Sequence, residues 1–414
     1  MKLAKYSIGI GDRFGHQGKA LLKAVLKAQE GGINLAIVWN KSFREHKITN
    51  TQPINVLKEA QEAVNALNWK GDYYIDADHI NLSNVELFLD SCNYFTIDVA
   101  DYIGKNASKQ STEKFIQKYN KYLGEIKLPI CEKLINITRK DIKEFAEKYL
   151  SPIKEAKKIY KKISQKKGRD NFIVEISLDE AENAQTPIEL FLLVNLIIEK
   201  EIPIQAIAPK FKGQFNKGVD YQGNLKNFKE DFESILAIIQ LLKNEFYLTK
   251  DFKLSIHSGS DKFSIYPIIN YLMKKYNEGI HLKTAGTTWL EELIGLALAS
   301  DEGLEIVKEI YQKAYERYNE LCSPYSMVID INKKQLPSPM DVINWDNNKI
   351  VKTLEHNPAC EDYNPNFRQF LHIAYKIAAE MGSYFTNLIQ KYEQIIAQHV
   401  TSNILDKHIK PLFS

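Results

Sequence analysis

Short apolar runs alternate with longer segments of helical spacing along most of the chain. Eight runs have the apolar and β-branched composition of buried strands, and they cover residues 6–10, 34–39, 72–76, 94–98, 172–176, 203–208, 252–257 and 280–284. Between them, apolar residues recur three or four positions apart, most clearly in 17–30, 56–67, 188–200, 228–245, 263–276 and 289–299. Such alternation predicts a parallel sheet, and eight strands predict an α/β fold of the (β/α)8 TIM-barrel type.

Two segments fall outside this alternation. Residues from about 105 to 168 separate the fourth and fifth strands and have a mostly helical pattern, and further helical patterns follow the eighth helix. We therefore expect a barrel in residues 1–300 with a helical insertion between strands 4 and 5, at about 105–168. Residues 301–414 should form a C-terminal helical extension that packs outside the barrel or leans over its mouth.

Composition and charge indicate a small-molecule partner. The chain has 414 residues with 55 Lys and Arg against 52 Asp and Glu, a net charge of +3, which favours neither nucleic acid nor an anionic membrane. Four scattered cysteines show no C-x-x-C spacing, so no disulfide framework or thiolate zinc site is predicted. With no signal peptide or membrane-spanning run, we expect a cytoplasmic protein. The sequence does not indicate an oligomeric state.

Polar residues gather where the apolar strands end. His257 ends the seventh strand within the run Ser255–Phe263, and Asp76, Asp78 and His79 lie at the end of the third strand or directly after it. The carboxyl ends of barrel strands meet on one face, where barrel enzymes have their active sites. We therefore expect the chemistry of this protein on that face.

Two histidines and a carboxylate on alternate strands form a candidate metal site. Glu175 lies inside the otherwise apolar fifth strand, where an uncompensated carboxylate would be costly to bury, so it is a candidate ligand or base. With His79 and His257 it gives a set that suits zinc, manganese or nickel, and Asp76 or Asp78 is the replacement if one ligand is wrong. The alternatives are structural: strand-end aspartates, and Asp179 and Glu180 in the next loop, can cap helices.

The residues at these strand ends also predict an anion-binding site. Ser258, Gly259 and Ser260, and the loop 285–288, place glycine and hydroxyl groups at helix starts after the last two strands. Lys262, Lys210 and Arg13 could add positive charge. The fragment Gly9-Ile10-Gly11 lacks the third glycine of a dinucleotide fingerprint, so no nucleotide site is predicted.

Several long motifs in order resemble the tagaturonate epimerase family. They cover residues 8–14, 76–82, 95–104, 254–267, 283–291 and 371–375, so that the likeness extends over nearly the whole chain. The resemblance implies a barrel and a metal-dependent isomerase that interconverts D-tagaturonate and D-fructuronate in hexuronate catabolism.

The reaction implied by the resemblance limits the mechanism. The inverted carbinol carbon is not adjacent to the ketone, so enolisation does not acidify its C–H bond. Retro-aldol cleavage and re-formation of a C–C bond is the direct alternative, and a divalent ion would stabilise the enediolate. We expect Asp78 or Glu175 as the catalytic carboxylate. The expected substrate-binding residues are Arg13, Lys210, Ser258, Ser260, Asp261, Lys262 and Thr284.

Two other functions fit the same strand-end residues. A sugar-phosphate aldolase or isomerase would use the two glycine loops for phosphate. A non-catalytic sugar-acid binding protein would bind its ligand without turnover.

Overall fold

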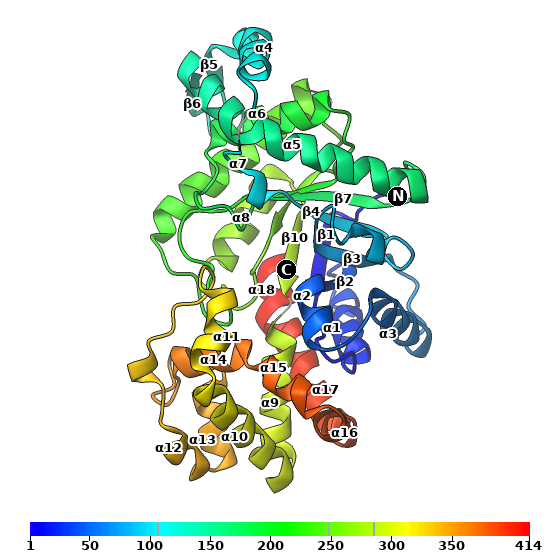
Figure 1. Cartoon of the computed structure of the whole chain (residues 1–414), viewed down its shortest axis with the longest axis vertical. Helices are drawn as coiled ribbons and strands as arrows, with labels where there is room; N and C mark the ends of the chain where they lie inside the picture. Colours follow the sequence, from blue (N-terminus) through cyan, green and yellow to red (C-terminus); the bar gives the residue numbers. More distant parts are fainter. Residues whose placement is uncertain (106, 247, 285) are drawn as a thin grey trace.

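The chain folds into a closed barrel of eight parallel strands, which confirms the predicted fold class (Figure 1). The structure is a computed structural model and describes all residues except 106, 247 and 285. The barrel strands are β1 (Tyr6–Ile10), β2 (Ala36–Ser42), β3 (Tyr73–Ile80), β4 (Tyr94–Asp98), β7 (Ile173–Ser177), β8 (Ala206–Ala208), β9 (Lys253–Ile256) and β10 (Ile280–Thr284). β1 pairs with both β2 and β10, so the sheet has no free edge.

Helices follow most of the strands and cover the outside of the barrel. They are α1 (Gly18–Glu30), α2 (Phe43–Ile48), α3 (Pro53–Ala66), α6 (Pro187–Glu199), α7 (Leu225–Glu245), α8 (Tyr266–Tyr276) and α9 (Thr287–Ala299). α6 begins at a capping box in which the Thr186 side chain accepts a hydrogen bond from the Glu189 backbone N–H. Most of its apolar residues are buried, and the helix packs against α5 (Arg139–Lys167) and α7.

Two layers fill the inside of the barrel. Six apolar residues form a small core separate from the main one: Leu3, Ala36, Val38, Tyr74, Tyr94 and Ile173. Nearer the carboxyl ends of the barrel strands the buried residues are polar, among them Asp76, Thr96, Glu175 and Lys283. The apolar layer closes the amino-terminal end, and the polar layer therefore faces the carboxyl ends of the strands.

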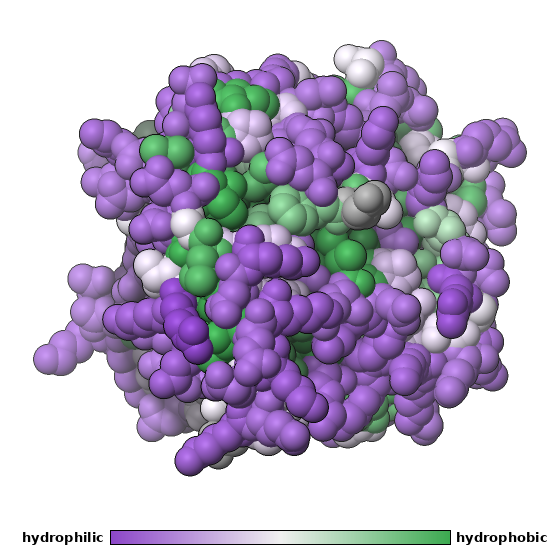
Figure 2. Space-filling view, turned by 90° about the horizontal axis from the view of Figure 1, so that it is seen from above, coloured by the Kyte–Doolittle hydropathy of each residue, from purple (hydrophilic) through white to green (hydrophobic). Residues whose placement is uncertain are grey.

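The insertion between β4 and β7 contains a hairpin as well as helices. α4 (Lys109–Tyr119) is followed by the antiparallel pair β5 (Gly124–Lys127) and β6 (Leu134–Ile137), and then by the 29-residue helix α5 (Arg139–Lys167). The sequence pattern indicated helix and missed the hairpin. Because both of its strands are short and mostly exposed, they lack a regular apolar alternation. From the end that carries the insertion, the surface is mostly hydrophilic with small, separate hydrophobic areas (Figure 2).

The C-terminal residues are helical and return to the barrel. They form α10 (Asp301–Glu316), α11 (Tyr318–Cys322), α12 (Pro339–Ile343), α13 (Asn347–Leu354), α14 (Pro365–Ile373), α15 (Tyr375–Met381), α16 (Ser383–Lys391), α17 (Glu393–Ser402), the π-helical segment Asn403–Ile409 and α18 (Lys410–Phe413). α17 packs against α1 and α9, whereas α10 to α14 gather at the end of the molecule opposite the insertion (Figure 1). The Phe413 ring lies 5.4 Å from that of Tyr6. A domain boundary at residue 300 stays a prediction.

Short 3-10 turns complete the connections between these elements. They are η1 (Val85–Phe88), η2 (Ala100–Tyr102), η3 (Asn120–Tyr122), η4 (Ser323–Tyr325) and η5 (Lys333–Gln335). Among the helices of the described residues, none combines the length and apolar character that a bilayer crossing needs.

Candidate active site

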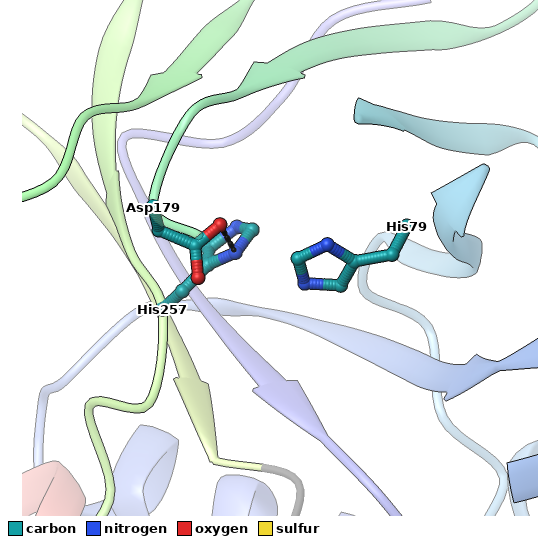
Figure 3. Close-up of side chains that lie close together, drawn as sticks. All are labelled: His79, Asp179 and His257. Atoms are coloured by element: carbon teal, nitrogen blue, oxygen red, sulfur yellow. Dashed lines mark ion pairs between the residues drawn. The ribbon is translucent and has the colours of Figure 1, made fainter. Parts of the chain in front are cut away.

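His79, Asp179 and His257 meet at the carboxyl ends of the barrel strands. One ligand atom from each lies within 4.8 Å of the other two. His79 belongs to β3, Asp179 to the loop after β7, and His257 follows β9 directly. The His79 ring points toward the Asp179–His257 pair from the other side of the barrel mouth (Figure 3). Two imidazoles and a carboxylate suit a divalent transition metal.

A β-bulge turns His79 into the mouth. The register between β3 and β4 shifts between Ala77 and Ile80, and His79 has a φ of 53°, which is unusual for a residue other than glycine. Its Nδ1 lies 2.9 Å from Oδ2 of Asp98, and His79, Asp98 and Glu180 form a second candidate metal group. Burial lowers the pKa of His79, but Asp78, Asp179 and Asp98 outweigh it and raise the pKa well above its usual value.

His257 lies between two carboxylates. Its Nε2 is 2.5 Å from Oε1 of Glu175, and its Nδ1 is 3.0 Å from Oδ1 of Asp179. Burial opposes the charge on the ring, yet Asp179 and Glu175 raise the pKa of His257 to about 9. Two raised histidine pKa values show that these carboxylates favour positive charge at this position. A divalent cation fits such a donor set.

Glu175 does not take the place in the group that the sequence analysis gave it. It is fully buried, accepts a hydrogen bond from the Tyr94 hydroxyl at 2.6 Å, and contacts His257 from inside the barrel. Asp179 is the carboxylate that lies beside both histidines. The strand pattern pointed to Glu175 because a buried charge stands out, whereas a loop aspartate at this position resembles an ordinary helix cap.

Lys283 on β10 holds the aspartates of β3, and the sequence analysis did not single it out. Its Nζ lies 2.8 Å from Asp76, 2.7 Å from Asp78 and 2.6 Å from the Thr96 hydroxyl. Burial raises the pKa of Asp76. For Asp78, Lys283 and the two nearby histidines outweigh burial and lower the pKa. Asp78 therefore lies ionised beside His79, and Asp76 lies deeper in the barrel. A lysine inside an apolar strand was the signal that could have revealed this contact.

Four of the predicted substrate-binding residues line the cavities at the barrel mouth: Arg13, Lys210, Ser258 and Ser260. Arg13 donates to the His372 carbonyl at 2.6 Å and lies 3.9 Å from the Tyr375 ring centroid. The Lys210 ammonium donates to the Ala181 carbonyl at 2.5 Å. Their role in substrate binding stays a prediction.

Asp261, Lys262 and Thr284 line none of these three cavities, and their expected role in substrate binding stays a prediction. All three are fully buried and have partners inside the protein. Asp261 pairs with Arg368 at 2.9 Å, and Thr284 donates to the Gly9 carbonyl at 2.7 Å. The Lys262 ammonium donates to the carbonyls of Asn216, Val219 and Ser260. A buried cation with three acceptors has no donor left for a substrate.

The other sequence-predicted loop and three further residues complete the mouth. In the loop 285–288, Ala285 is outside the described residues, and Gly286 lines the cavity that also contains Asp78 and His79. Asn40, Lys217 and His372 line the same cavity. The sequence analysis missed these three. Asn40 and Lys217 lie outside the motifs, and His372, although it lies within the motif 371–375, comes from a helix far along the chain and was not singled out as a site residue.

A closed barrel with histidines and carboxylates at its carboxyl face is the architecture of a barrel enzyme. Residues 1–412 match the model of a family described as tagaturonate epimerase. The chain therefore belongs to the tagaturonate epimerase family and is an epimerase, an enzyme of the isomerase class. This membership favours neither a sugar-phosphate enzyme nor a non-catalytic binding protein.

Characterised relatives agree with this assignment. A tagaturonate/fructuronate epimerase from Thermotoga maritima is 26% identical over 416 residues, covering 98% of this chain and 79% of the relative. Crystal structures of fructuronate-tagaturonate epimerase from Cohnella laeviribosi have the same fold: the native form has a TM-score of 0.81 and the form with one glycerol a TM-score of 0.82. Both are 24% identical to this chain and cover 100% of it and 82% of the crystallised chain.

Proposed function

We propose that this epimerase interconverts D-tagaturonate and D-fructuronate, that it needs a divalent metal ion, and that it works by retro-aldol cleavage. The substrate pair is the one named for its relatives. The observation that supports metal dependence is the approach of His79, Asp179 and His257 to within 4.8 Å of one another. Zinc, manganese and nickel all accept this donor set.

His79, Asp179 and His257 would hold the ion, and Glu175 would orient His257 through its other ring nitrogen. Such a carboxylate behind a histidine ligand fixes both the tautomer and the direction of the ring. The bound ion would supply Lewis-acid stabilisation for negative charge on the substrate oxygens. Catalytic sites keep coordination positions open, and three protein ligands leave room for a substrate.

Retro-aldol chemistry accounts for inversion at a carbon that is not adjacent to a ketone. A base removes the proton of the carbinol hydroxyl, and the neighbouring C–C bond breaks. Its electron pair passes to the ketone half as an enediolate, and the other half becomes an aldehyde that carries the carboxylate. The aldehyde turns to present its other face, the C–C bond forms again, and the base returns its proton. No oxidant or reductant is consumed.

Asp78 is the proposed base, because it is the ionised carboxylate that lines the cavity next to His79. Lys283 fixes its position at 2.7 Å. The same ammonium compensates the negative charges of Asp76 and Glu175, so it keeps three buried carboxylates in one small volume. Lys283 therefore acts as a positioning residue.

Incubation with D-fructuronate tests this function. Protein stripped with EDTA should be inactive, and addition of manganese, zinc or nickel should restore formation of D-tagaturonate. In D2O the product should carry no deuterium at the inverted carbon, because the retro-aldol route leaves that C–H bond intact. Supplied with dihydroxyacetone and the three-carbon aldehyde acid, the enzyme should make both ketouronates. Deuterium at the inverted carbon, or no synthesis from the two halves, would overturn the mechanism.

A further inference from the structure

Three polar residues, Asn40, Lys217 and His372, line the same cavity as the candidate metal group without belonging to that group. Asn40 and His372 are each 2% exposed. Asn40 Nδ2 and Oδ1 and His372 Nδ1 have no hydrogen-bond partner within the described part of the chain. Buried polar groups without partners are costly, so a ligand with several polar atoms fits this wall.

The positively charged side chains at the barrel mouth differ in how many hydrogen bonds and ion pairs they already form within the protein. The Arg13 guanidinium donates to Glu45 at 3.3 Å and to the His372 carbonyl. The Lys283 ammonium donates to Asp76, Asp78 and Thr96. Lys210 and Lys262 donate to backbone carbonyls. For the Lys217 ammonium no hydrogen bond or ion pair to a described residue is found, although burial lowers the pKa of this lysine. Lys217 is half-buried, and an unengaged ammonium in a half-buried position favours an anionic ligand.

The loop that carries Lys217 is held firmly on both sides of it. The Lys217 backbone N–H donates to the Val328 carbonyl at 2.8 Å. The carbonyl of Asn216 accepts from Lys262 at 2.8 Å, and that of Gly218 accepts from Arg368 at 2.6 Å. Two fully buried cations therefore fix the backbone before and after Lys217. The contacts of the buried Lys262 ammonium with the carbonyls of this loop are therefore those of a positioning residue.

We propose that Lys217 binds the carboxylate of the ketouronate, with Asn40 and His372 as partners for its hydroxyl groups. This inference rests on the proposed function, since it assigns one end of that substrate to a residue. Lys217 shares its cavity with His79, Asp179 and His257, so a substrate could reach both at once. A charged hydrogen bond would hold the carboxylate and direct the rest of the sugar toward the metal group.

A lysine at this position also suits the reaction. After cleavage, the half that carries the carboxylate has to turn before the bond re-forms. An ammonium is a compact charge that holds one oxygen at a time, whereas a guanidinium binds a carboxylate through two parallel hydrogen bonds. A single contact allows that half to turn about its attachment while it stays bound.

Lys217→Met and a matched control test the assignment in the metal-loaded enzyme. A hydrogen bond to a charged group contributes about 1.5–3 kcal/mol, so we expect the KM for D-fructuronate to rise roughly 10- to 100-fold. Lys217→Arg should keep the KM within a few-fold of wild type and lower kcat, because it restricts the turn. Lys212→Met is the control: it lies in the same loop, its side chain is 64% exposed, and it pairs with Asp231. An unchanged KM for Lys217→Met, or an equal rise in the control, would overturn the assignment.

Binding of small fragments separates this inference from the proposed function. D-Glycerate and glycerol differ by the carboxylate, and calorimetry on the metal-loaded protein should show that wild type binds D-glycerate more tightly. Lys217→Met should abolish that preference while its circular dichroism spectrum stays unchanged. If wild type does not convert D-fructuronate, the proposed function fails, yet the fragment comparison still decides the role of Lys217. A preference for D-glycerate that persists in Lys217→Met would overturn that role.

Discussion

The Nε2 atom of His257 lies 2.5 Å from the Oε1 atom of Glu175, inside the barrel and behind the candidate metal group. The other ring nitrogen, Nδ1, faces Asp179 at 3.0 Å. One carboxylate therefore lies on the cavity side of the imidazole and the other on the core side. This arrangement assigns them different tasks: Asp179 can share a metal ion with His257, and Glu175 can orient the ring.

Glu175→Gln should weaken metal binding without abolishing it. The amide keeps the shape of the side chain, but the ring loses the negative charge that orients it and raises its basicity. Loss of such a supporting carboxylate typically costs about 10- to 100-fold in metal affinity. We expect a loss of this size in a metal titration of the EDTA-treated protein. Asp179→Asn is the comparison and should lose more, because it removes a ligand; equal losses in the two variants would contradict the division of tasks.

Asp78→Asn should lower kcat while metal content and substrate affinity stay near those of wild type. Losing a general base typically costs about 10² to 10⁴ in rate. Asp78 contacts Lys283, so the variant also needs a check of folding, for which circular dichroism is sufficient. Steady-state kinetics beside elemental analysis gives the answer. Turnover at the wild-type rate would show that another group takes the carbinol proton.

Lys262→Met should destabilise the protein and should not act directly on substrate preference. Three backbone carbonyls accept from the Lys262 ammonium, and the substitution leaves them buried without a donor. Each unpaired group costs about 1–3 kcal/mol, so the free energy of unfolding should fall by several kcal/mol. Urea unfolding measures this loss, with the exposed Lys212→Met as a control that stays within about 0.5 kcal/mol of wild type. A wild-type midpoint together with a lost preference for uronates would support the original substrate assignment.

The barrel was predictable because its strands are read from local composition. Each of the eight strands, from 6–10 to 280–284, is rich in apolar and β-branched residues and is separated from the next strand by a long segment, so each can be predicted from its own residues. The hairpin of β5 and β6 was not predictable from the sequence. Its strands are short and mostly exposed, so they have no apolar face that would give a regular pattern of apolar residues. Strand count and spacing therefore gave the class of fold, and the irregular insertion had to be seen in the structure.

The site was predictable only for residues at the end of a strand or directly after it. His79 and His257 stand at strand ends and meet as expected, because parallel strands share one carboxyl face. Asp179 lies in a loop, and its approach to His257 depends on how that loop turns. Lys262 has the composition of an anion-binding residue, yet its side chain turns into the core. Sequence spacing places a residue on an element, but it does not give the direction of a side chain beyond that element.

His281 should make the stability of the protein depend on pH. This residue is fully buried on β10, its Nδ1 lies 2.9 Å from the Ser7 hydroxyl, and burial lowers its pKa to about 3. In the unfolded chain a histidine has a pKa of about 6.5, so between these values the unfolded state binds more protons. The stabilisation is therefore complete above about pH 6.5 and is lost as the pH falls toward 3.

Comparison with His281→Gln isolates this contribution, because the amide does not titrate and the other groups are shared. One pKa unit corresponds to about 1.4 kcal/mol. Between pH 7.5 and pH 5 we therefore expect the free energy of unfolding of wild type to fall by about 2 kcal/mol more than that of the variant. Both proteins should be unfolded in urea with EDTA present, since protons and metal ions compete for His79 and His257. If the two pH profiles ran parallel, His281 would not be the group responsible, and the buried His46, whose pKa is lowered to about 4, would be the next to examine.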